Sequence, residues 1–226
     1  MQTTWTGRTG FGRELRGLQD EVLVLGSMVD KAIDRSIDAL RRLDQLAAHQ
    51  IIRDDQQINR KRFDVENAAI ALIATQQPMA RDLRTIVAVL NIIVELERMG
   101  DYAKGIAEIV LRHGEQPLLK PLIDVPRMAD KARDMLRRSL DAFVARDAEA
   151  TRRIAAEDDE VDALYDQVYR ELLTFMLQDP KTIDRATWLL WTAHNLERIA
   201  DRVTNICERV VYEATGEMAE MNVSNY

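Results

Sequence analysis

Glu97-Arg98-Met99-Gly100-Asp101 returns one hundred residues later as Glu197-Arg198-Ile199-Ala200-Asp201. In each copy a carboxylate is followed by another four residues on, and positions i and i+4 lie on the same face of an α-helix. The flanking residues repeat as well, because Leu96 matches Leu196 and Glu108 matches Glu208. We therefore expect two homologous helical halves, each with a pair of stacked acids on its last helix.

Composition favours a helical protein and argues against a nucleic-acid partner. The chain has 226 residues, of which 46% are hydrophobic and 31% charged, with nine glycines and five prolines. Its formal net charge of −7 opposes binding to nucleic acid or to an anionic membrane surface. The single cysteine, Cys207, suits a reducing compartment, and no membrane-spanning run or secretory leader is visible. We expect a cytoplasmic protein without a membrane span.

Apolar residues recur at the three- and four-residue spacing of helices, and prolines mark the breaks. Helices are expected at 13–48, 54–75 and 79–112, and again at 126–145, 148–177 and 181–214. Short connections make successive helices antiparallel. The predicted fold class is all-α, with six helices in two tandem, pseudo-symmetric three-helix bundles. The bundles would span 13–114 and 126–214, with a proline-containing linker at 115–125 and a tail at 215–226.

A second pair of acids, on the first helix of each half, repeats at the same spacing. Asp30 and Asp34 are echoed by Asp130 and Asp134. If the first and third helices of a half are neighbours, these pairs face the acids of the third helix. The two predicted sets are Asp30, Asp34, Glu97 and Asp101 in the first half, and Asp130, Asp134, Glu197 and Asp201 in the second.

Four carboxylates at one seam can remain together only if some pKa values rise or a cation is bound. Oxygen ligands favour Mg²⁺, Ca²⁺, Mn²⁺ or iron, and the scarcity of Cys and His argues against a structural zinc site of the usual kind. The hypothesis is therefore one multi-carboxylate metal site in each half. The alternative is that the acids form ordinary salt bridges, with Arg98 and Arg198 as available partners.

No catalytic constellation is visible. His194 precedes Glu197 by three residues, which is the reverse of the Glu-x-x-His order of ferritin-type di-iron sites. A phosphate-binding glycine loop and a Ser/His/Asp arrangement are both missing from the sequence. We expect a regulator rather than an enzyme. A carboxylate-bundle metal store or metal-dependent enzyme, and a metal-free helical adaptor, remain as alternatives.

The segment Gln77-Pro78-Met79-Ala80-Arg81-Asp82-Leu83-Arg84, followed by the first acidic motif at 96–101, resembles the signature of the PhoU family of phosphate-transport accessory proteins. The second copy, Asn195 to Asp201 with Asn205-Ile206-Cys207-Glu208, is similar to that family's second repeat. The resemblance covers roughly residues 13–213.

This resemblance implies a six-helix protein that binds multinuclear metal, with iron, magnesium, manganese or zinc as the candidates. It implies ligands at Glu97, Asp101, Glu197 and Asp201, with Asp30, Asp34, Asp130 and Asp134 matching the same acidic spacing. It also implies a homodimer that links the ATPase of a phosphate ABC transporter to a membrane sensor histidine kinase, and that restrains uptake and the starvation response.

Two positions depart from the family pattern. The second half has Gln178-Asp179-Pro180-Lys181 in place of the Gln-Pro-x-Ala-x-Asp-Leu-Arg segment, and Gly105 replaces the asparagine that the second copy keeps at Asn205. We therefore expect metal occupancy to differ between the halves.

Overall fold

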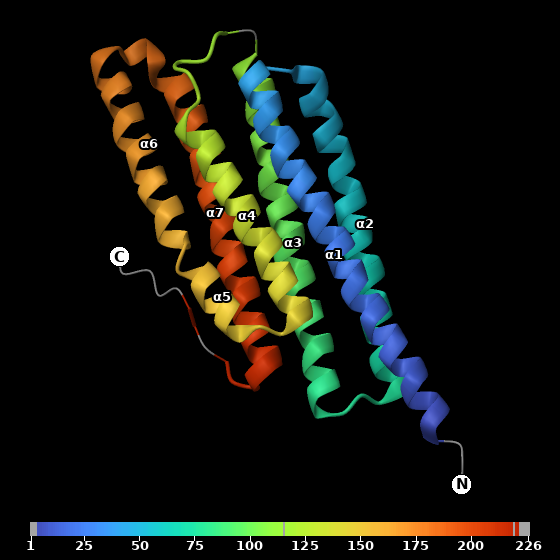
Figure 1. The fold of residues 1–226 in the computed structure, drawn as a ribbon. Helices are drawn as coiled ribbons and strands as arrows, with labels where there is room; N and C mark the ends of the chain where they lie inside the picture. Colours follow the sequence, from blue (N-terminus) through green and yellow to red (C-terminus); the bar gives the residue numbers. More distant parts are fainter. Residues whose placement is uncertain (1–3, 115, 219, 222–226) are drawn as a thin grey trace.

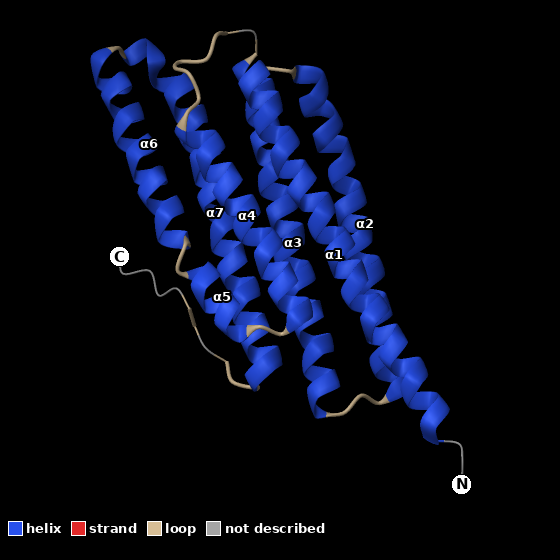
Figure 2. Ribbon diagram, viewed as in Figure 1, coloured by secondary structure: helices blue, strands red, loops and turns tan. Residues whose placement is uncertain are grey.

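The computed structural model describes residues 4–114, 116–218 and 220–221, and within these residues it contains helices and no strand (Figure 2). The helices are α1 (Thr4–Arg42), α2 (Gln45–Gln76), α3 (Ala80–His113), α4 (Asp124–Ala145), α5 (Ala148–Ala155), α6 (Asp158–Gln178), the short 3₁₀ helix η1 (Pro180–Thr182) and α7 (Ile183–Thr215). In Figure 1 the first half runs up, down and up and the second half down, up and down, with α5 and α6 together in the place of one predicted helix. The predicted all-α class with two tandem bundles is confirmed.

The turn between α1 and α2 comes earlier than predicted. Leu43 has a left-handed φ of 53°, and the Asp44 side chain accepts a hydrogen bond from the Ala47 amide at 2.9 Å. A side-chain oxygen in this position satisfies a free amide of the first helical turn and so starts a helix. The predicted boundaries at 48 and 54 are wrong, because the apolar pattern around the buried Ile51 already belongs to α2.

The second half repeats this turn 103 residues later. Arg146 has a φ of 55°, and Asp147 accepts a hydrogen bond from the Ala150 amide at 2.9 Å. Ser36 and Ser139, also 103 residues apart, each donate to the carbonyl three residues before them at 2.8 Å. Helices α1 and α4 therefore correspond at an offset of 103, whereas α3 and α7 keep the offset of 100 seen in their buried faces.

This register changes which acids are equivalent. At an offset of 103, Asp30 and Asp34 correspond to Arg133 and Arg137. The predicted equivalence of Asp30 and Asp34 with Asp130 and Asp134 is wrong, because those four residues repeat in sequence without occupying the same structural positions.

The predicted helix at 148–177 is interrupted. Helix α5 ends at Ala155 and α6 begins at Asp158 with three acids in its first turn, where negative charge is favourable to the helix dipole. Glu157, at the junction, lies 2.8 Å from the Lys131 ammonium and is also bound by Arg138. Two cations from α4 therefore hold the break in place.

Helices α3 and α7 form the centre of the molecule and make the most extensive helix–helix contact (Figure 1). Leu96, Leu196 and Cys207 are fully buried there. A Cβ atom added to Gly105 would lie 3.3 Å from Nδ2 of Asn195, so glycine permits a close approach of the two helices. At the symmetry-related point, Asn205 donates to the Glu95 carboxylate at 3.1 Å.

The tail turns back along α7 after Gly216, as far as it is described (Figure 1). The amide of Met221 donates to Glu208 at 3.0 Å. The remainder of the predicted tail, at 222–226, lies outside the described residues. None of the described helices combines the length and apolar content that a bilayer crossing requires.

Candidate metal centre

Glu197 and Asp201 lie on α7 beside Asp162 of α6. The Glu197 side chain is 13% exposed. Its Oε2 atom lies 3.3 Å from Nδ1 of His194, but it is buried and has no hydrogen-bond partner among the described residues. A buried carboxylate oxygen without a donor is costly, and a cation is one way to satisfy it.

Burial and mutual repulsion raise the pKa values of this cluster. Burial raises the pKa of Glu197 to about 7, and the charges of Asp201 and Asp162 add to the effect. The pKa of Asp201 is raised by burial, and that of Asp162 by burial and the charge of Asp201. Burial lowers the pKa of His194, so the neighbouring imidazole does not supply a permanent positive charge. We call Glu197, Asp201 and Asp162 the α7 cluster.

The first half has a related group, made by Glu97 and Asp101 of α3 with Asp55 of α2. Burial and the charge of Asp101 raise the pKa of Glu97, and burial and the charge of Asp55 raise that of Asp101. Asp55 is only 5% exposed, and it accepts from Lys104 at 3.2 Å and from Asn59 at 3.2 Å. We call Glu97, Asp101 and Asp55 the α3 cluster.

The two clusters differ in the basic side chains beside them. Lys104 lies 3.9 Å from Asp101 and neutralises part of the α3 cluster. The equivalent residue in α7 is Thr204, whose hydroxyl donates to the Asp201 carbonyl at 2.7 Å. Asn59 of α2 corresponds to Asp162 of α6, at the offset of 103. Arg198 lies 3.6 Å from Asp201, whereas Arg98 of the first half pairs with Glu95 at 3.2 Å. Each cluster therefore has three carboxylates and one paired basic residue. The buried Glu197 oxygen without a donor makes the α7 cluster the stronger candidate for a metal ion.

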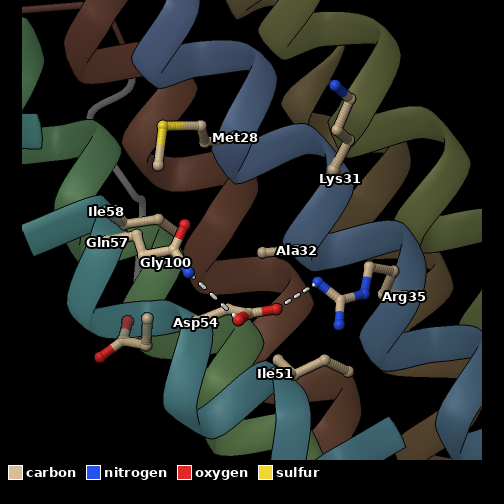
Figure 3. Close-up of a pocket in the computed structure, with 10 residues that line it drawn as sticks. Met28, Lys31, Ala32, Arg35, Ile51, Asp54, Gln57, Ile58 and Gly100 are labelled. Atoms are coloured by element: carbon tan, nitrogen blue, oxygen red, sulfur yellow. Dashed lines mark hydrogen bonds and ion pairs between the residues drawn. The ribbon is translucent and has the colours of Figure 1, made fainter.

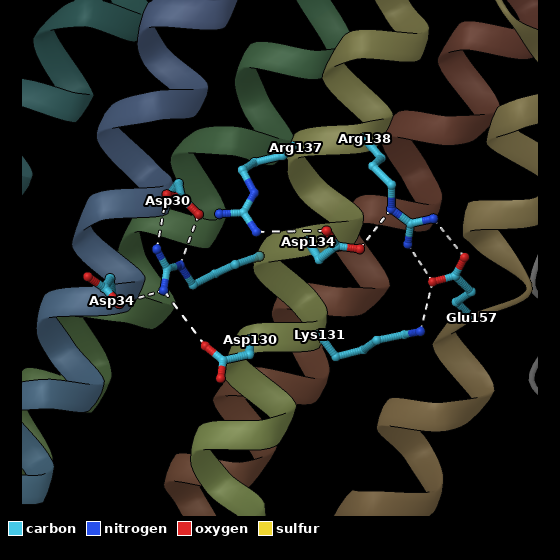
Figure 4. Close-up of polar contacts among 9 residues, drawn as sticks. Asp30, Asp34, Asp130, Lys131, Asp134, Arg137, Arg138 and Glu157 are labelled. Carbon is cyan, nitrogen blue, oxygen red and sulfur yellow. Dashed lines mark hydrogen bonds and ion pairs between the residues drawn. The ribbon is translucent and has the colours of Figure 1, made fainter.

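Asp30 and Asp34 do not join the α3 cluster. The Asp30 carboxylate accepts from Nε of Arg133 at 2.9 Å and from Nη2 at 3.2 Å, and Asp34 binds Nη1 of the same guanidinium (Figure 4). The charges that act on Glu97 come from α2 and α3. The predicted seam between α1 and α3 is wrong, because Asp30 and Asp34 face α4 across the junction of the two halves.

Asp130 and Asp134 likewise lie with arginines (Figure 4). Asp130 is 3.9 Å from Arg133, and Asp134 is 2.8 Å from Nε of Arg138 and 3.8 Å from Arg137. Asp130 is 78% exposed, so solvent already stabilises its charge. For these four acids the salt-bridge alternative describes the structure.

Replacing Arg133 with alanine is expected to lower the free energy of unfolding by about 2 kcal/mol, because Asp30 is 17% exposed and would lose both of its donors. Arg137→Ala is the matched control one turn away. Its carboxylate contact is 3.8 Å long between half-exposed groups, and such pairs contribute less than about 1 kcal/mol. Urea titrations measure both variants. Equal losses for the two would show that the Arg133 contact has no special role.

The ligand chemistry of the α7 cluster suits a hard divalent cation. Its carboxyl groups have raised pKa values, and one buried carboxylate oxygen has no hydrogen-bond donor. Within the described part of the chain, no three His, Cys, Asp or Glu side chains are gathered tightly enough to hold a metal as they stand. Binding therefore requires side-chain rotation. Glu197, Asp201 and Asp162 are the residues that would hold the ion.

The sequence prediction missed Asp55 and Asp162. Asp55 lies between the buried Ile51 and Ile58 at the spacing of the inward face, so a carboxylate at a core position was a visible signal. Asp162 had no such signal, because it lies beside the buried Val161 on the exposed side of α6. Its role follows only from the register between the halves.

Comparisons with known proteins agree with this two-part architecture. The family model described as "PhoU domain" matches residues 22–110 and again 125–210. The phosphate-specific transport system accessory protein PhoU homolog of Clostridium acetobutylicum is 37% identical over 213 residues, which cover 94% of this chain and 97% of that protein. The Aquifex aeolicus homolog is 36% identical, with 92% and 94% of the two chains covered.

Two solved structures of PhoU proteins are also similar to this chain. The crystal structure of the phosphate transport system regulatory protein PhoU from Streptococcus pneumoniae has a TM-score of 0.86 and 33% identity, and the match covers 92% of this chain and 99% of that one. PhoU from Pseudomonas aeruginosa also has a TM-score of 0.86, at 32% identity, with 92% and 100% covered. The chain belongs to the PhoU family.

Proposed function

We propose that the protein is a cytoplasmic accessory regulator of phosphate transport that restrains phosphate uptake and starvation signalling when phosphate is plentiful. The observation that carries the proposal is likeness over almost the full length to proteins named as phosphate-transport accessory and regulatory proteins. In this role the protein works as a homodimer that bridges the ATPase of a phosphate ABC transporter and a membrane sensor histidine kinase, without catalysing a reaction.

The α7 cluster supplies the proposed metal site. A divalent ion such as iron, magnesium, manganese or zinc bound by Glu197, Asp201 and Asp162 would relieve the repulsion that raises their pKa values. Binding would also join α6 to α7 through a common ion. The α3 cluster binds more weakly, because Lys104 already donates to the buried Asp55 at 3.2 Å, whereas a buried oxygen of Glu197 in the α7 cluster has no donor.

The metal affects regulation by fixing the geometry of the second bundle. Helix α6 forms an outer edge of the molecule (Figure 1), and Tyr169, Leu173 and Leu177 along it are 45%, 40% and 78% exposed. An exposed apolar face of this kind fits a protein contact. A metal between α6 and α7 would hold that face in one position relative to the core.

The double variant Glu197→Gln with Asp201→Asn is expected to lose most of the metal that the purified wild type retains, as measured by elemental analysis after purification without chelator. Asp130→Asn is the control, because it removes an exposed acid from the same sequence repeat. Retention of the wild-type metal content by the double variant would refute the site.

The regulatory role has its own test. Deletion of the gene is expected to switch on a phosphate-starvation reporter at high phosphate, and the wild-type chain should restore repression. Affinity capture of the tagged protein from its host, probed for the transporter ATPase and the kinase, checks the two partners. If the reporter stays silent on deletion and neither partner is recovered, the regulatory proposal fails, whatever the metal result.

A further inference from the structure

A cavity of about 180 Å³ lies between α1 and α2, with Gly100 of α3 among its lining residues (Figure 3). Met28, Ala32, Ile51 and Ile58 make up its apolar wall. It is separate from the α7 cluster and lies in the other half of the molecule. Its size suits a small molecule rather than a helix or a strand.

Most charges at this cavity are already neutralised. Arg35 donates to Asp54 at 2.8 Å, and the Gln57 amide donates to the same carboxylate at 3.3 Å (Figure 3). Asp55 is bound by Lys104 at 3.2 Å. Lys31 also lines the cavity, and its ammonium forms no ion pair with a carboxylate in the described part of the chain. One positive charge is therefore uncompensated at the mouth.

The second half has larger residues at two of the equivalent positions. At the offset of 103, Met135 replaces Ala32, and at the offset of 100, Ala200 replaces Gly100; both are fully buried. Lys131 stands where the first half has Met28, and its ammonium lies 2.8 Å from Glu157 and 2.9 Å from Glu160. The larger side chains and the bridging lysine are missing from the first half. Ala32 and Gly100 therefore leave space in the first half where the second half has larger side chains. A cavity of the second half, of about 440 Å³, lies instead between α4 and α5, with Arg138, Ile154 and Glu157 among its lining residues.

We propose that this cavity binds a small organic monoanion with a compact apolar body. The apolar part would lie against Met28, Ala32 and Ile58, and the anionic group would meet the Lys31 ammonium. A bare inorganic anion fits poorly, because Asp54 and Asp55 line the same space and would repel an ion without an apolar body. The proposal does not depend on the regulatory role or on a metal ion in the α7 cluster; the cavity does adjoin the α3 cluster, because Asp55 belongs to both.

Benzoate is the probe. Benzamide, its neutral isostere, tests the need for a charge, and inorganic phosphate tests an anion that has no apolar body. Titrations are followed through the backbone amides of Gly100 and Ile58 by ¹H–¹⁵N NMR, with EDTA present so that carboxylate binding to a metal does not contribute. Benzoate is expected to give saturable shifts at these amides. Benzamide should bind at least about tenfold more weakly, since a charge-assisted hydrogen bond is worth about 1.5 kcal/mol.

Two variants, with one control, test the charge and the space separately. Lys31→Met should weaken benzoate binding by about tenfold, whereas Lys131→Met, which removes an ion-paired lysine of the second half, should leave it unchanged. Ala32→Met introduces the residue that the second half uses and should abolish binding while the protein stays folded. The proposal is overturned if benzoate gives no saturable shift, if benzamide or phosphate binds as tightly, or if Ala32→Met binds like the wild type.

Discussion

Glu197→Gln is expected to stabilise the metal-free protein at neutral pH by about 2–3 kcal/mol, and at the same time to weaken cation binding. Burial raises the pKa of this carboxyl from 4.5 to about 7, with Asp201 and Asp162 adding to the shift. Each unit corresponds to about 1.4 kcal/mol. Glutamine has the shape of the neutral acid and does not ionise, so it removes the cost of burying a charge beside two others.

The pH dependence gives the sign of this effect. Because the pKa is raised in the folded state, the neutral carboxyl contributes its stability fully below the unfolded value of 4.5, and this contribution is lost as pH rises to about 7. The wild type and Glu197→Gln should therefore be equally stable near pH 4 and should diverge towards pH 8. Urea titrations in EDTA across this range measure the difference. Parallel curves would contradict the account of the α7 cluster.

Glu213→Ala is expected to cost about 3–5 kcal/mol of unfolding free energy, which is the largest loss we foresee for a single polar residue. The Glu213 side chain is fully buried, and its Oε1 accepts from the Thr85 hydroxyl and from Nε of Arg146, both at 2.8 Å. Arg146 also donates to Thr85 at 2.9 Å. The network joins α3, α7 and the turn after α4, so its loss leaves a partly buried guanidinium without its carboxylate.

Glu217→Ala, four residues later on the exposed tail, is the control and should change stability by less than about 0.5 kcal/mol. Thermal and chemical unfolding measure both variants. The same measurements on Arg146→Ala and on the double variant Glu213→Ala with Arg146→Ala complete a mutant cycle, which gives the coupling energy between the two side chains. A loss below about 1 kcal/mol for Glu213→Ala, or additive effects in the cycle, would show that the buried network is not a cooperative unit.

The helical fold could be predicted from the sequence because its signal is local. The apolar spacing along α3 and α7, together with the repeat of Glu97 and Asp101 at Glu197 and Asp201, is enough to identify two similar halves. The break between α5 and α6 was not visible in the same way, because Glu157 at the junction is bound by Arg138 and Lys131 of α4, and contacts between helices leave no local signal in the sequence.

The acid clusters were harder to predict, because they depend on register between helices. Matching Asp30 with Asp130 by sequence was reasonable, but α4 is shifted by three residues relative to that match, which puts Arg133 opposite Asp30. Sequence spacing gives the face of a helix on which a residue lies. It does not give the register of two packed helices along their axes, and that register decides which acids lie close together.

The most direct test of the central claim is anomalous X-ray scattering from crystals grown with Mn²⁺. We predict a peak about 2.2 Å from carboxylate oxygens of Glu197 and Asp201, with a weaker peak or none beside Glu97 and Asp101. A peak only among the exposed acids Asp130 and Asp134, or none in the second half at saturating Mn²⁺, would contradict it.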